Sequence, residues 1–315
     1  MLTQQQLDRA VGTVIASAAG DALGAPYEFH APVLPPTPIT LHAGGPWELG
    51  EWTDDTSMAV PILQAVARGR GLDDSTTLAG IVGEWIGWCR SAKDVGIQTK
   101  AVLAGIRHVT EEDARTAARA VHDRNGRSGG NGSLMRTGPV ALGYLGDGQA
   151  DAAAAAARRV SELTHFEVDA GDACAVWSLA IRSAILDGTL ELRTAVDTLP
   201  VERASVWHGR LDAAEAALPW ELPDNNGWVV AALQAAWSAI THGSSLREVL
   251  ELAVRAGNDT DTVAAIAGSL AGAVFGASEL PDEWVSALHG WPADEFRSFG
   301  AAELTDLALK AVGAP

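Results

Sequence analysis

Apolar residues in this 315-residue chain recur at intervals of three and four, and this spacing restricts the possible folds more than any other feature. It places apolar side chains along one face of an α-helix. The alternation of apolar and polar residues that is typical of strands is nearly absent. We therefore predict an all-α fold, a compact bundle of many helices joined by short polar connections. The clearest helical segments are 7–18, 58–66, 173–184, 228–237 and 263–274.

Three stretches interrupt the helical pattern. Residues 31–50 contain five prolines, which cannot continue a helix. Residues 123–133 are rich in glycine, and we expect a loop there. Residues 199–226 combine three prolines with mixed charge, and we expect them to form a lid or a connector.

Two smaller features concern the packing of individual helices. Glycines at 268, 272 and 276 are four residues apart, which predicts that a neighbouring helix packs closely against this face. Pro61 lies inside the segment 58–66, where we expect it to kink the helix or leave one carbonyl unpaired.

The chain carries 22 Lys and Arg residues against 40 Asp and Glu residues, a formal net charge of −18. This excess of negative charge disfavours a general nucleic-acid binder, which needs a basic face. It does not exclude an anionic small ligand, because bound cations or local dipoles can reverse the sign of the charge within a site.

The apolar runs and the cysteines indicate the compartment. No uninterrupted apolar run is long enough to cross a bilayer, since the segment 263–275 is short and rich in glycine. Residues 10–19 resemble the apolar core of a weak secretory signal peptide. However, the segment before them contains Asp8 and no lysine, so we do not expect a signal peptide here. The two cysteines, Cys89 and Cys174, lie in apolar helical patterns and form no metal-binding pair. We therefore predict a cytoplasmic protein with reduced thiols and no membrane partner.

Two acidic clusters lie far apart in the sequence, and each precedes a long apolar-periodic segment. They are Thr53-Asp54-Asp55-Thr56 and Asp259-Thr260-Asp261-Thr262. At a helix N-terminus, Thr and Asp act as caps and the helix dipole favours carboxylates, but capping needs only one such residue. Several adjacent carboxylates repel each other unless a cation neutralises them, and two converging clusters suit a pair of Mg²⁺ or Mn²⁺ ions. The residue types alone leave helix capping and metal binding open.

Five motifs occur together and in order within residues 10–276. Each motif is weak by itself, but the ordered set is specific. They are Gly20-Asp21-Ala22-Leu23-Gly24 followed by Glu28, Thr53-Asp54-Asp55-Thr56, Gly130-Asn131-Gly132-Ser133-Leu134-Met135-Arg136, Thr164-His165, and Asp259-Thr260-Asp261-Thr262. With this set, the sequence resembles the ADP-ribosylglycohydrolase family, the group that includes dinitrogenase-reductase-activating glycohydrolase.

The resemblance implies hydrolysis of the N- or O-glycosidic bond between ADP-ribose and a protein side chain or a small molecule. It also implies a cleft with two Mg²⁺ or Mn²⁺ ions, which would bind the distal ribose and orient a water near its anomeric carbon. Because the first and last motifs would then serve one site, we expect residues 1–315 to form a single domain. The implied metal ligands are Thr53, Asp54 and Asp55 from the first cluster and Asp259, Asp261 and Thr262 from the second.

Two carboxylates are candidates for the catalytic group at the reacting bond, because glycosidic cleavage uses positioned carboxylates. Glu28 follows the first motif, where the family has a glutamate in a mobile segment over the cleft. Asp94 lies in a stretch similar to a family segment whose aspartate faces the cleft. The alternatives are a surface glutamate for Glu28 and, for Asp94, a cap on a helix expected near Val95. Asp21 either supports the metal ligands or forms a turn.

The glycine-rich loop is a candidate binding site for the pyrophosphate of ADP-ribose. Glycine lets backbone N–H groups approach an anion, and a helix expected to begin at Leu134 would direct its positive end to the phosphates. A flexible loop without a ligand is the alternative interpretation. The candidate residues are Gly129, Gly130, Asn131, Gly132 and Ser133.

Two further residues are assigned to ADP-ribose by the same resemblance. His165, expected to open the helix that carries Trp177, would contact the diphosphate or the ribose; a purely structural histidine is the alternative. Trp228 stands where the family has a tyrosine, so a hydroxyl contact is lost while stacking on adenine is retained. Filling of the core is the alternative for Trp228.

Two functions therefore remain open. The first is an active metal-dependent ADP-ribosyl hydrolase, whose partner is an ADP-ribosylated protein or a small ADP-ribosyl conjugate and whose product is ADP-ribose. The second is an ADP-ribose-binding module that uses the same cleft without turnover. The presence of both Glu28 and Asp94 favours the hydrolase. A helical scaffold without any ligand would leave the clustered carboxylates unexplained.

Overall fold

The structure is a computed structural model that describes residues 1–223, 225–293 and 298–314. Apart from one small two-stranded sheet, the regular secondary structure of the described residues is helical, so the prediction of an all-α fold is confirmed. The first helices are α1 (Gln4–Gly24), α2 (Asp54–Ala67), α3 (Ser75–Trp88), α4 (Ile97–Gly105), α5 (Glu111–Asn125), α6 (Gly138–Leu142) and α7 (Ala150–Ser161). They are followed by α8 (Val168–Asp187), α9 (Leu192–Val196), α10 (Val201–Glu215), α11 (Val229–His242), α12 (Leu246–Val254), α13 (Thr260–Phe275), α14 (Asp282–Ala287) and α15 (Ala301–Ala311). The 3₁₀ helices are η1 (Ala25–Tyr27), η2 (Asn131–Ser133), η3 (Pro219–Glu221) and η4 (Ala277–Glu279), and the strands are β1 (His289–Ala293) and β2 (Ser298–Gly300).

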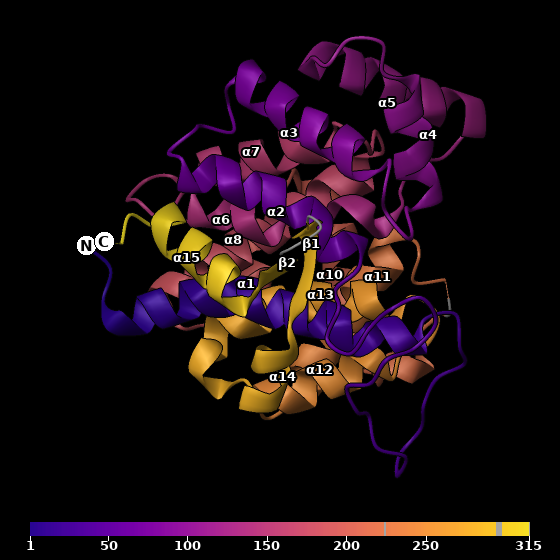
Figure 1. Cartoon of the computed structure of the whole chain (residues 1–315), viewed down its shortest axis with the longest axis vertical. Coiled ribbons are helices and arrows are strands. Elements are labelled where there is room, and N and C mark those ends of the chain that lie inside the picture. Colours follow the sequence, from indigo (N-terminus) through magenta and orange to yellow (C-terminus); the bar gives the residue numbers. More distant parts are fainter. Residues whose placement is uncertain (224, 294–297, 315) are drawn as a thin grey trace.

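Helices α1 and α13 pack along each other in the middle of the molecule, and the other helices surround this pair (Figure 1). Helices α8, α11 and α12 pack on α13, while α2 and α15 contact each other and α1. Figure 1 shows α3, α4 and α5 at one end of the long axis and α12 and α14 at the other. Among the described residues, no helix combines the length and the hydropathy that a bilayer crossing requires.

The close packing of α1 on α13 depends on glycine, as predicted from the spacing at 268 and 272. A Cβ atom at Gly272 would lie 2.0 Å from the carbonyl oxygen of Gly12, and one at Gly268 would lie 2.2 Å from that of Ala16. The contact continues to the end of α1, where a Cβ at Gly24 would lie 2.5 Å from Cα of Asp261. The last turn of α1 therefore touches the first turn of α13, which carries the second acidic cluster.

Asp21 fixes the start of α2 against α1. Its carboxylate accepts hydrogen bonds from the backbone N–H groups of Thr53 at 2.8 Å and Thr56 at 2.9 Å, and from the Thr56 hydroxyl at 2.6 Å. The first N–H groups of a helix lack partners within the helix, so this carboxylate satisfies them. Asp21 itself lies within α1, and the interpretation of it as a turn residue is wrong.

The C-terminal hairpin contacts the segment that leads into α2. The N–H of Trp52 donates to the carbonyl of His289 at 3.0 Å, and the N–H of His289 donates to the carbonyl of Gly50 at 3.1 Å. Strands β1 and β2 pair antiparallel, and period-two alternation did not predict them because they are short and include Pro292.

Three local predictions can be compared with the structure. Most of the segment 199–226 is not a lid or a connector, because α10 spans Val201–Glu215 and packs on α11. Its prolines flank helices, with Pro200 at the N-cap of α10 and Pro219 at the first position of η3, both of which tolerate proline. Helix α2 continues through Pro61 to Ala67, so the proline does not end it. Residues 31–50 are irregular, as predicted.

Candidate metal centre and cleft

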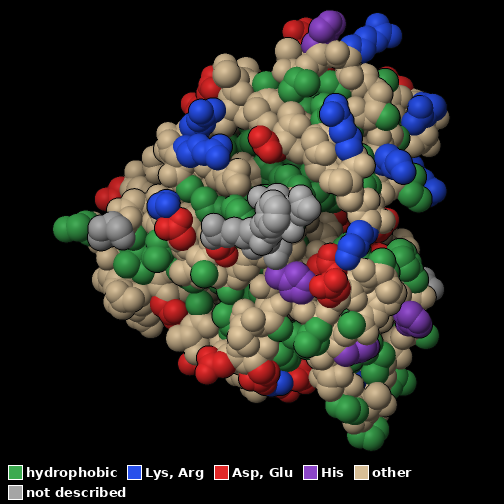
Figure 2. Space-filling model, in the orientation of Figure 1, with side chains coloured by type: hydrophobic (Ala, Val, Ile, Leu, Met, Phe, Trp, Pro, Cys, Tyr) green, Lys and Arg blue, Asp and Glu red, His purple; other side chains and the backbone are tan. Residues whose placement is uncertain are grey.

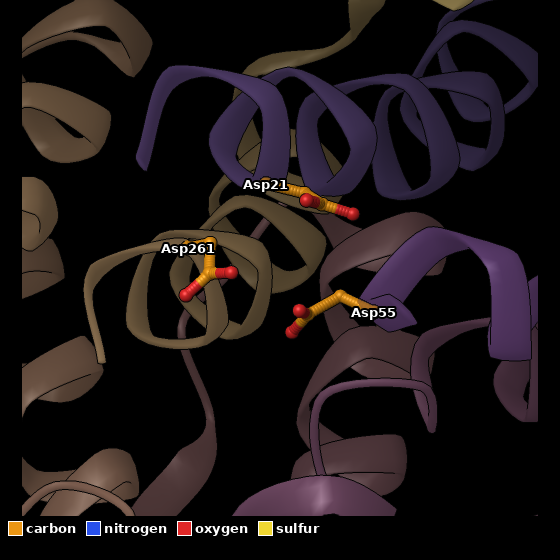
Figure 3. Close-up of side chains that lie close together, drawn as sticks. All are labelled: Asp21, Asp55 and Asp261. Atoms are coloured by element: carbon orange, nitrogen blue, oxygen red, sulfur yellow. The ribbon is translucent and has the colours of Figure 1, made fainter. Parts of the chain in front are cut away.

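Three helix ends meet at one point, and each contributes a carboxylate. Figure 3 shows Asp21 from α1, Asp55 from α2 and Asp261 from α13 directed towards one another. One carboxylate oxygen from each lies within 4.8 Å of the other two. A second trio, Glu28, Asp259 and Asp261, meets the same criterion. The two predicted acidic clusters therefore converge, and Asp261 belongs to both trios.

Threonine hydroxyls lie between the two clusters. The Thr53 hydroxyl oxygen is 3.1 Å from an Asp55 carboxylate oxygen and 3.3 Å from one of Asp261. The Thr262 hydroxyl oxygen is 3.4 Å from the same Asp55 oxygen, Oδ2. The other oxygen, Oδ1 of Asp55, is buried and has no hydrogen-bond partner within the described residues. A buried carboxylate oxygen without a partner is costly, so it marks a position where a cation would be stabilising.

Burial and mutual repulsion raise the pKa values of the clustered carboxyls. Burial, followed by the neighbouring carboxylates, raises the pKa of Asp54 to about 7 and that of Glu28 to about 8. The same two causes raise the pKa values of Asp55 and Asp261 well above the ordinary value. The protein by itself therefore disfavours the ionised cluster, whereas a divalent cation would favour it. Hard oxygen donors of this kind suit Mg²⁺, Mn²⁺ or Ca²⁺.

Asn226 supports the second acidic cluster and was missed by the sequence analysis. Its side-chain oxygen accepts from the backbone N–H of Asp259 at 3.2 Å, and its amide donates to the carbonyl of Gly257 at 2.8 Å. The side chain of Asn131 donates to the Asp259 carboxylate at 2.8 Å and to the carbonyl of Asn226 at 2.9 Å. Only the Asn225-Asn226-Gly227 turn pattern marks this position in the sequence.

The glycine-rich loop lies beside Trp228 and lines a cavity of about 650 Å³. The N–H groups of Gly129 and Gly130 donate no hydrogen bond within the described residues, whereas the N–H of Ser128 donates to Glu167 at 2.7 Å. The Ser133 hydroxyl is turned into the protein, where it accepts from the Ser161 hydroxyl at 2.9 Å. Phosphate binding by this loop stays a prediction. The backbone N–H groups of Gly129, Gly130 and Gly132 are the candidate donors to a phosphate.

The helix expected to begin at Leu134 does not form. The loop passes through η2 at Asn131–Ser133, and the next helix, α6, begins only at Gly138. Pro139 lies in the first turn of α6, where a helix tolerates proline because the N–H that proline lacks would have no partner within the helix. No helix N-terminus at Leu134 therefore faces the loop.

His165 is buried against the glycine-rich loop, ahead of α8, which begins at Val168 and not at His165 as predicted. Arg136 donates to the Thr164 hydroxyl at 2.6 Å, and the oxygen of that hydroxyl lies 2.7 Å from Nδ1 of His165, within hydrogen-bond distance. A Cβ at Gly130 or Gly132 would lie 3.3 Å from Nε2 of His165, so this ring nitrogen faces the loop. Burial, and then the charge of Arg136, hold the pKa of His165 well below its ordinary value.

Glu28 and Asp94 lie at the rim of the acidic centre. The backbone next to Glu28 is tied to the second cluster, because Phe29 N–H donates to the Asn258 carbonyl at 2.7 Å and Asn258 N–H to the His30 carbonyl at 2.8 Å. Asp94 is exposed, and its charge contributes to the raised pKa of Glu28. Asp94 does not cap α4, whose N-cap is Gly96, so the capping interpretation is wrong.

Trp228 is at the N-cap of α11 and is 37% exposed, so the interpretation of its side chain as core filling is wrong. Its ring lies 5.8 Å from the guanidinium of Arg210 and lines the same cavity as Gly129 and Gly130. An aromatic face beside free N–H groups suits a ligand with a planar ring and an anionic group. Adenine stacking stays a prediction.

The chain is similar to several known proteins. It is 30% identical over 299 residues to an ADP-ribosylarginine hydrolase, Tri1, from Pseudomonas putida, covering 90% of this chain and 74% of that protein. It is 29% identical to the ADP-ribosyl-[dinitrogen reductase] glycohydrolase of Rhodospirillum rubrum, covering 89% of this chain and 90% of that protein. A solved structure described as an ADP-ribosylglycohydrolase-related protein complex aligns with a TM-score of 0.74 and 28% identity over 99% of each chain. Because the ADP-ribosylglycohydrolase family model also matches residues 2–314, the chain belongs to the ADP-ribosylglycohydrolase family.

Proposed function

We propose that this protein is a metal-dependent hydrolase that cleaves the glycosidic bond between ADP-ribose and an acceptor and releases ADP-ribose. The observation that carries the proposal is the meeting of carboxylates from α1, α2 and α13, with Oδ1 of Asp55 buried and without a hydrogen-bond partner in the described part of the chain. The names of the similar proteins support the choice of ADP-ribose. The proposed substrate is an ADP-ribosylated protein or a small ADP-ribosyl conjugate.

The presence of two neighbouring trios of carboxylates supports two divalent ions, Mg²⁺ or Mn²⁺, for which Asp55, Asp259 and Asp261 would supply ligands. Asp21 would position the start of α2 in this arrangement. When bound, such ions polarise oxygen atoms and lower the pKa of a bound water, which becomes a nucleophile. The Thr53 and Thr262 hydroxyls lie between the clusters and complete an all-oxygen donor set. The proposed ligands are Thr53, Asp54, Asp55, Asp259, Asp261 and Thr262.

The protein groups around the centre have separate tasks in this proposal. Glu28 lies beside Asp259 and Asp261, where it moves the proton between the attacking water and the leaving group. The rim position of Asp94 makes it the second carboxylate at the reacting bond. Free N–H groups of Gly129 and Gly130, with Nε2 of His165, hold the diphosphate in place.

The exposed ring of Trp228 supports adenine stacking at the far end of the cleft. We further propose that residues 1–315 act as one unit, because the acidic centre takes residues from both α1 and α13. A reducing compartment, the cytoplasm, is proposed because the thiols of Cys89 and Cys174 are both free.

The decisive experiment measures released ADP-ribose from a panel of ADP-ribosylated substrates, with and without EDTA. EDTA and the substitutions Asp55→Ala and Asp261→Ala should each abolish release, while Asp306→Ala, on the surface of α15, should not. Glu28→Gln should reduce turnover more than it reduces ADP-ribose affinity. Full activity of Asp261→Ala would refute the metal centre. Metal-dependent ADP-ribose binding without any release would favour the binding module.

A further inference from the structure

Residues 28–40, the Glu28 segment, follow η1 and have little apolar contact with the rest of the protein. Within this segment Ile39 is buried, Glu28 and Val33 are partly buried, and the other residues are exposed. In Figure 1 the segment belongs to the indigo loop at the lower right, and Figure 2 shows hydrophobic side chains on the projecting tip of this part of the face. Because little apolar surface is buried here, the position of the segment depends on polar contacts.

Arg255 makes two of these polar contacts. It is the C-cap residue of α12, and only 9% of it is exposed. Its guanidinium donates from Nη1 to the carbonyl of Val33 at 2.8 Å and from Nη2 to the carbonyl of Thr37 at 2.9 Å. The far end of the segment is held separately, because the N–H of Thr40 donates to the Tyr27 hydroxyl at 2.9 Å. Since the planar guanidinium holds two carbonyls at once, Arg255 ties the middle of the Glu28 segment to the end of α12.

The residues that follow Arg255 contact the start of the segment. Phe29 and Asn258, which share a backbone hydrogen bond, both have positive φ angles, 62° and 57°. Residues other than glycine rarely adopt such angles, and they keep them only where surrounding contacts maintain the backbone. A Cβ at Gly257 would lie 2.7 Å from the backbone nitrogen of Pro32, so the two backbones are in direct contact there. The backbone beside Glu28 therefore depends on the stretch that begins at Arg255.

One short stretch of chain thus contacts both the Glu28 segment and the acidic centre. Residues 255–258 contact the segment, and the next residue, Asp259, belongs to the same trio of carboxylates as Glu28. Building on the proposed function, we propose that Arg255 is a positioning residue, which fixes the segment to α12 and thereby holds the Glu28 carboxylate within its trio. Arg255 touches neither the substrate nor an ion in this proposal, because it acts through backbone carbonyls.

A double-mutant cycle on the full-length protein, with released ADP-ribose as the readout, tests this role. Arg255→Ala should lower kcat about 10- to 100-fold and change KM little. The residual turnover of Glu28→Gln should fall no further when Arg255→Ala is added, because the carboxylate to be positioned is gone. Arg255→Lys should recover part of kcat, since the ammonium keeps the charge and loses the planar fork. The control Arg247→Ala, also in α12, removes an arginine that pairs with Glu251 and Glu283 and should leave kcat unchanged.

Hydrogen exchange gives a second measurement that needs no turnover. In Arg255→Ala, the amide protons of Phe29 and Asn258 should exchange about tenfold faster than in the wild type, because each donates across the contact that Arg255 supports. The affinity for Mg²⁺ or Mn²⁺ should stay nearly unchanged, since Asn226 supports Asp259 independently of Arg255. If Arg255→Ala does not fold, Arg255→Lys keeps the buried charge and gives the same comparisons at smaller amplitude.

The outcomes separate this role from the proposed function. An equal fall in kcat with and without Glu28→Gln, or unchanged exchange at Phe29 and Asn258, would overturn the positioning role of Arg255. Faster exchange in Arg255→Ala, combined with no release of ADP-ribose by the wild type from any substrate, would instead refute the proposed hydrolase. The anchoring of the Glu28 segment by Arg255 would then still stand.

Discussion

Without divalent ions, the acidic centre should make this protein less stable as the pH rises from 5 to 8. The folded state raises the pKa of Asp54 from 3.8 to about 7, because burial and neighbouring carboxylates disfavour its charge. Between these values the folded protein binds a proton that the unfolded chain has released, so stability falls as the pH rises. The full contribution of Asp54 to stability is present below pH 3.8, and it is lost as the pH rises through the folded-state pKa of about 7.

The size of this effect follows from the displaced pKa. The folded and unfolded pKa values of Asp54 differ by about three pH units, and at about 1.36 kcal/mol per unit this difference contributes about 4 kcal/mol to the free energy of unfolding. Partial solvent access lowers this contribution towards about 2 kcal/mol. The unfolding entropy of a chain of 315 residues is about 0.66 kcal/mol/K, from about 2.1 cal/mol/K per residue. The melting temperature of the metal-free protein should therefore fall by about 3 to 6 °C in all above pH 3.8, and about two thirds of this fall, about 2 to 4 °C, should occur between pH 5 and pH 8.

Scanning calorimetry in EDTA, and then with Mg²⁺ or Mn²⁺, is the assay. The cation binds ionised carboxylates, so its stabilising effect should grow with pH, opposite to the trend in EDTA. One ion at about 100 times its Kd adds about 2.7 kcal/mol, which corresponds to about 4 °C in this chain. Asp261→Asn should flatten both trends. A melting temperature that rises with pH in EDTA would refute the reasoning.

Two further predictions concern glycine packing and the support of Asp259. Gly20→Ala should destabilise the protein by several kcal/mol in calorimetry, because its Cβ would lie 2.2 Å from the carbonyl oxygen of Ala264. Gly80→Ala, in α3 with open space at that position, should instead stabilise it by about 0.5–1 kcal/mol, and equal effects would contradict the packing argument. Asn226→Ala should weaken Mg²⁺ or Mn²⁺ binding about 10- to 100-fold in titration calorimetry, whereas unchanged affinity would show that Asp259 needs no such support.

The sequence predicted those parts of the site that depend on local pattern. Thr53 and Asp259 come just before α2 and α13, and both apolar-periodic segments form helices close to the predicted bounds. The convergence of the two clusters, by contrast, came from the family resemblance. Nothing local in either cluster specifies its distance from the other, since 207 residues separate Thr262 from Asp55.

Other features of the site depend on contacts that local patterns do not encode. Asp21 looks like a turn residue beside Gly20 and Gly24, yet it lies inside α1 and accepts hydrogen bonds from the first turn of α2. Its role becomes visible only when α1 and α2 are placed together. The contact between β1 and residues 50–52, beside a cavity that adjoins the acidic centre, is equally long-range and joins a short strand with no alternation to an irregular segment.

The glycines of α1 determine how close together the carboxylates of the acidic centre lie. Because Gly12, Gly20 and Gly24 have no side chains, the backbones of α1 and α13 are in contact along their whole shared length. That contact sets Asp21 and Asp261 at a distance where their oxygens lie within 4.8 Å of Asp55. Larger residues on α1 would separate the helices, and the carboxylates would then be too far apart to share an ion. The glycines of the first motif therefore allow the close helix packing that positions the carboxylates, and the aspartates supply the charge that a cation would bind.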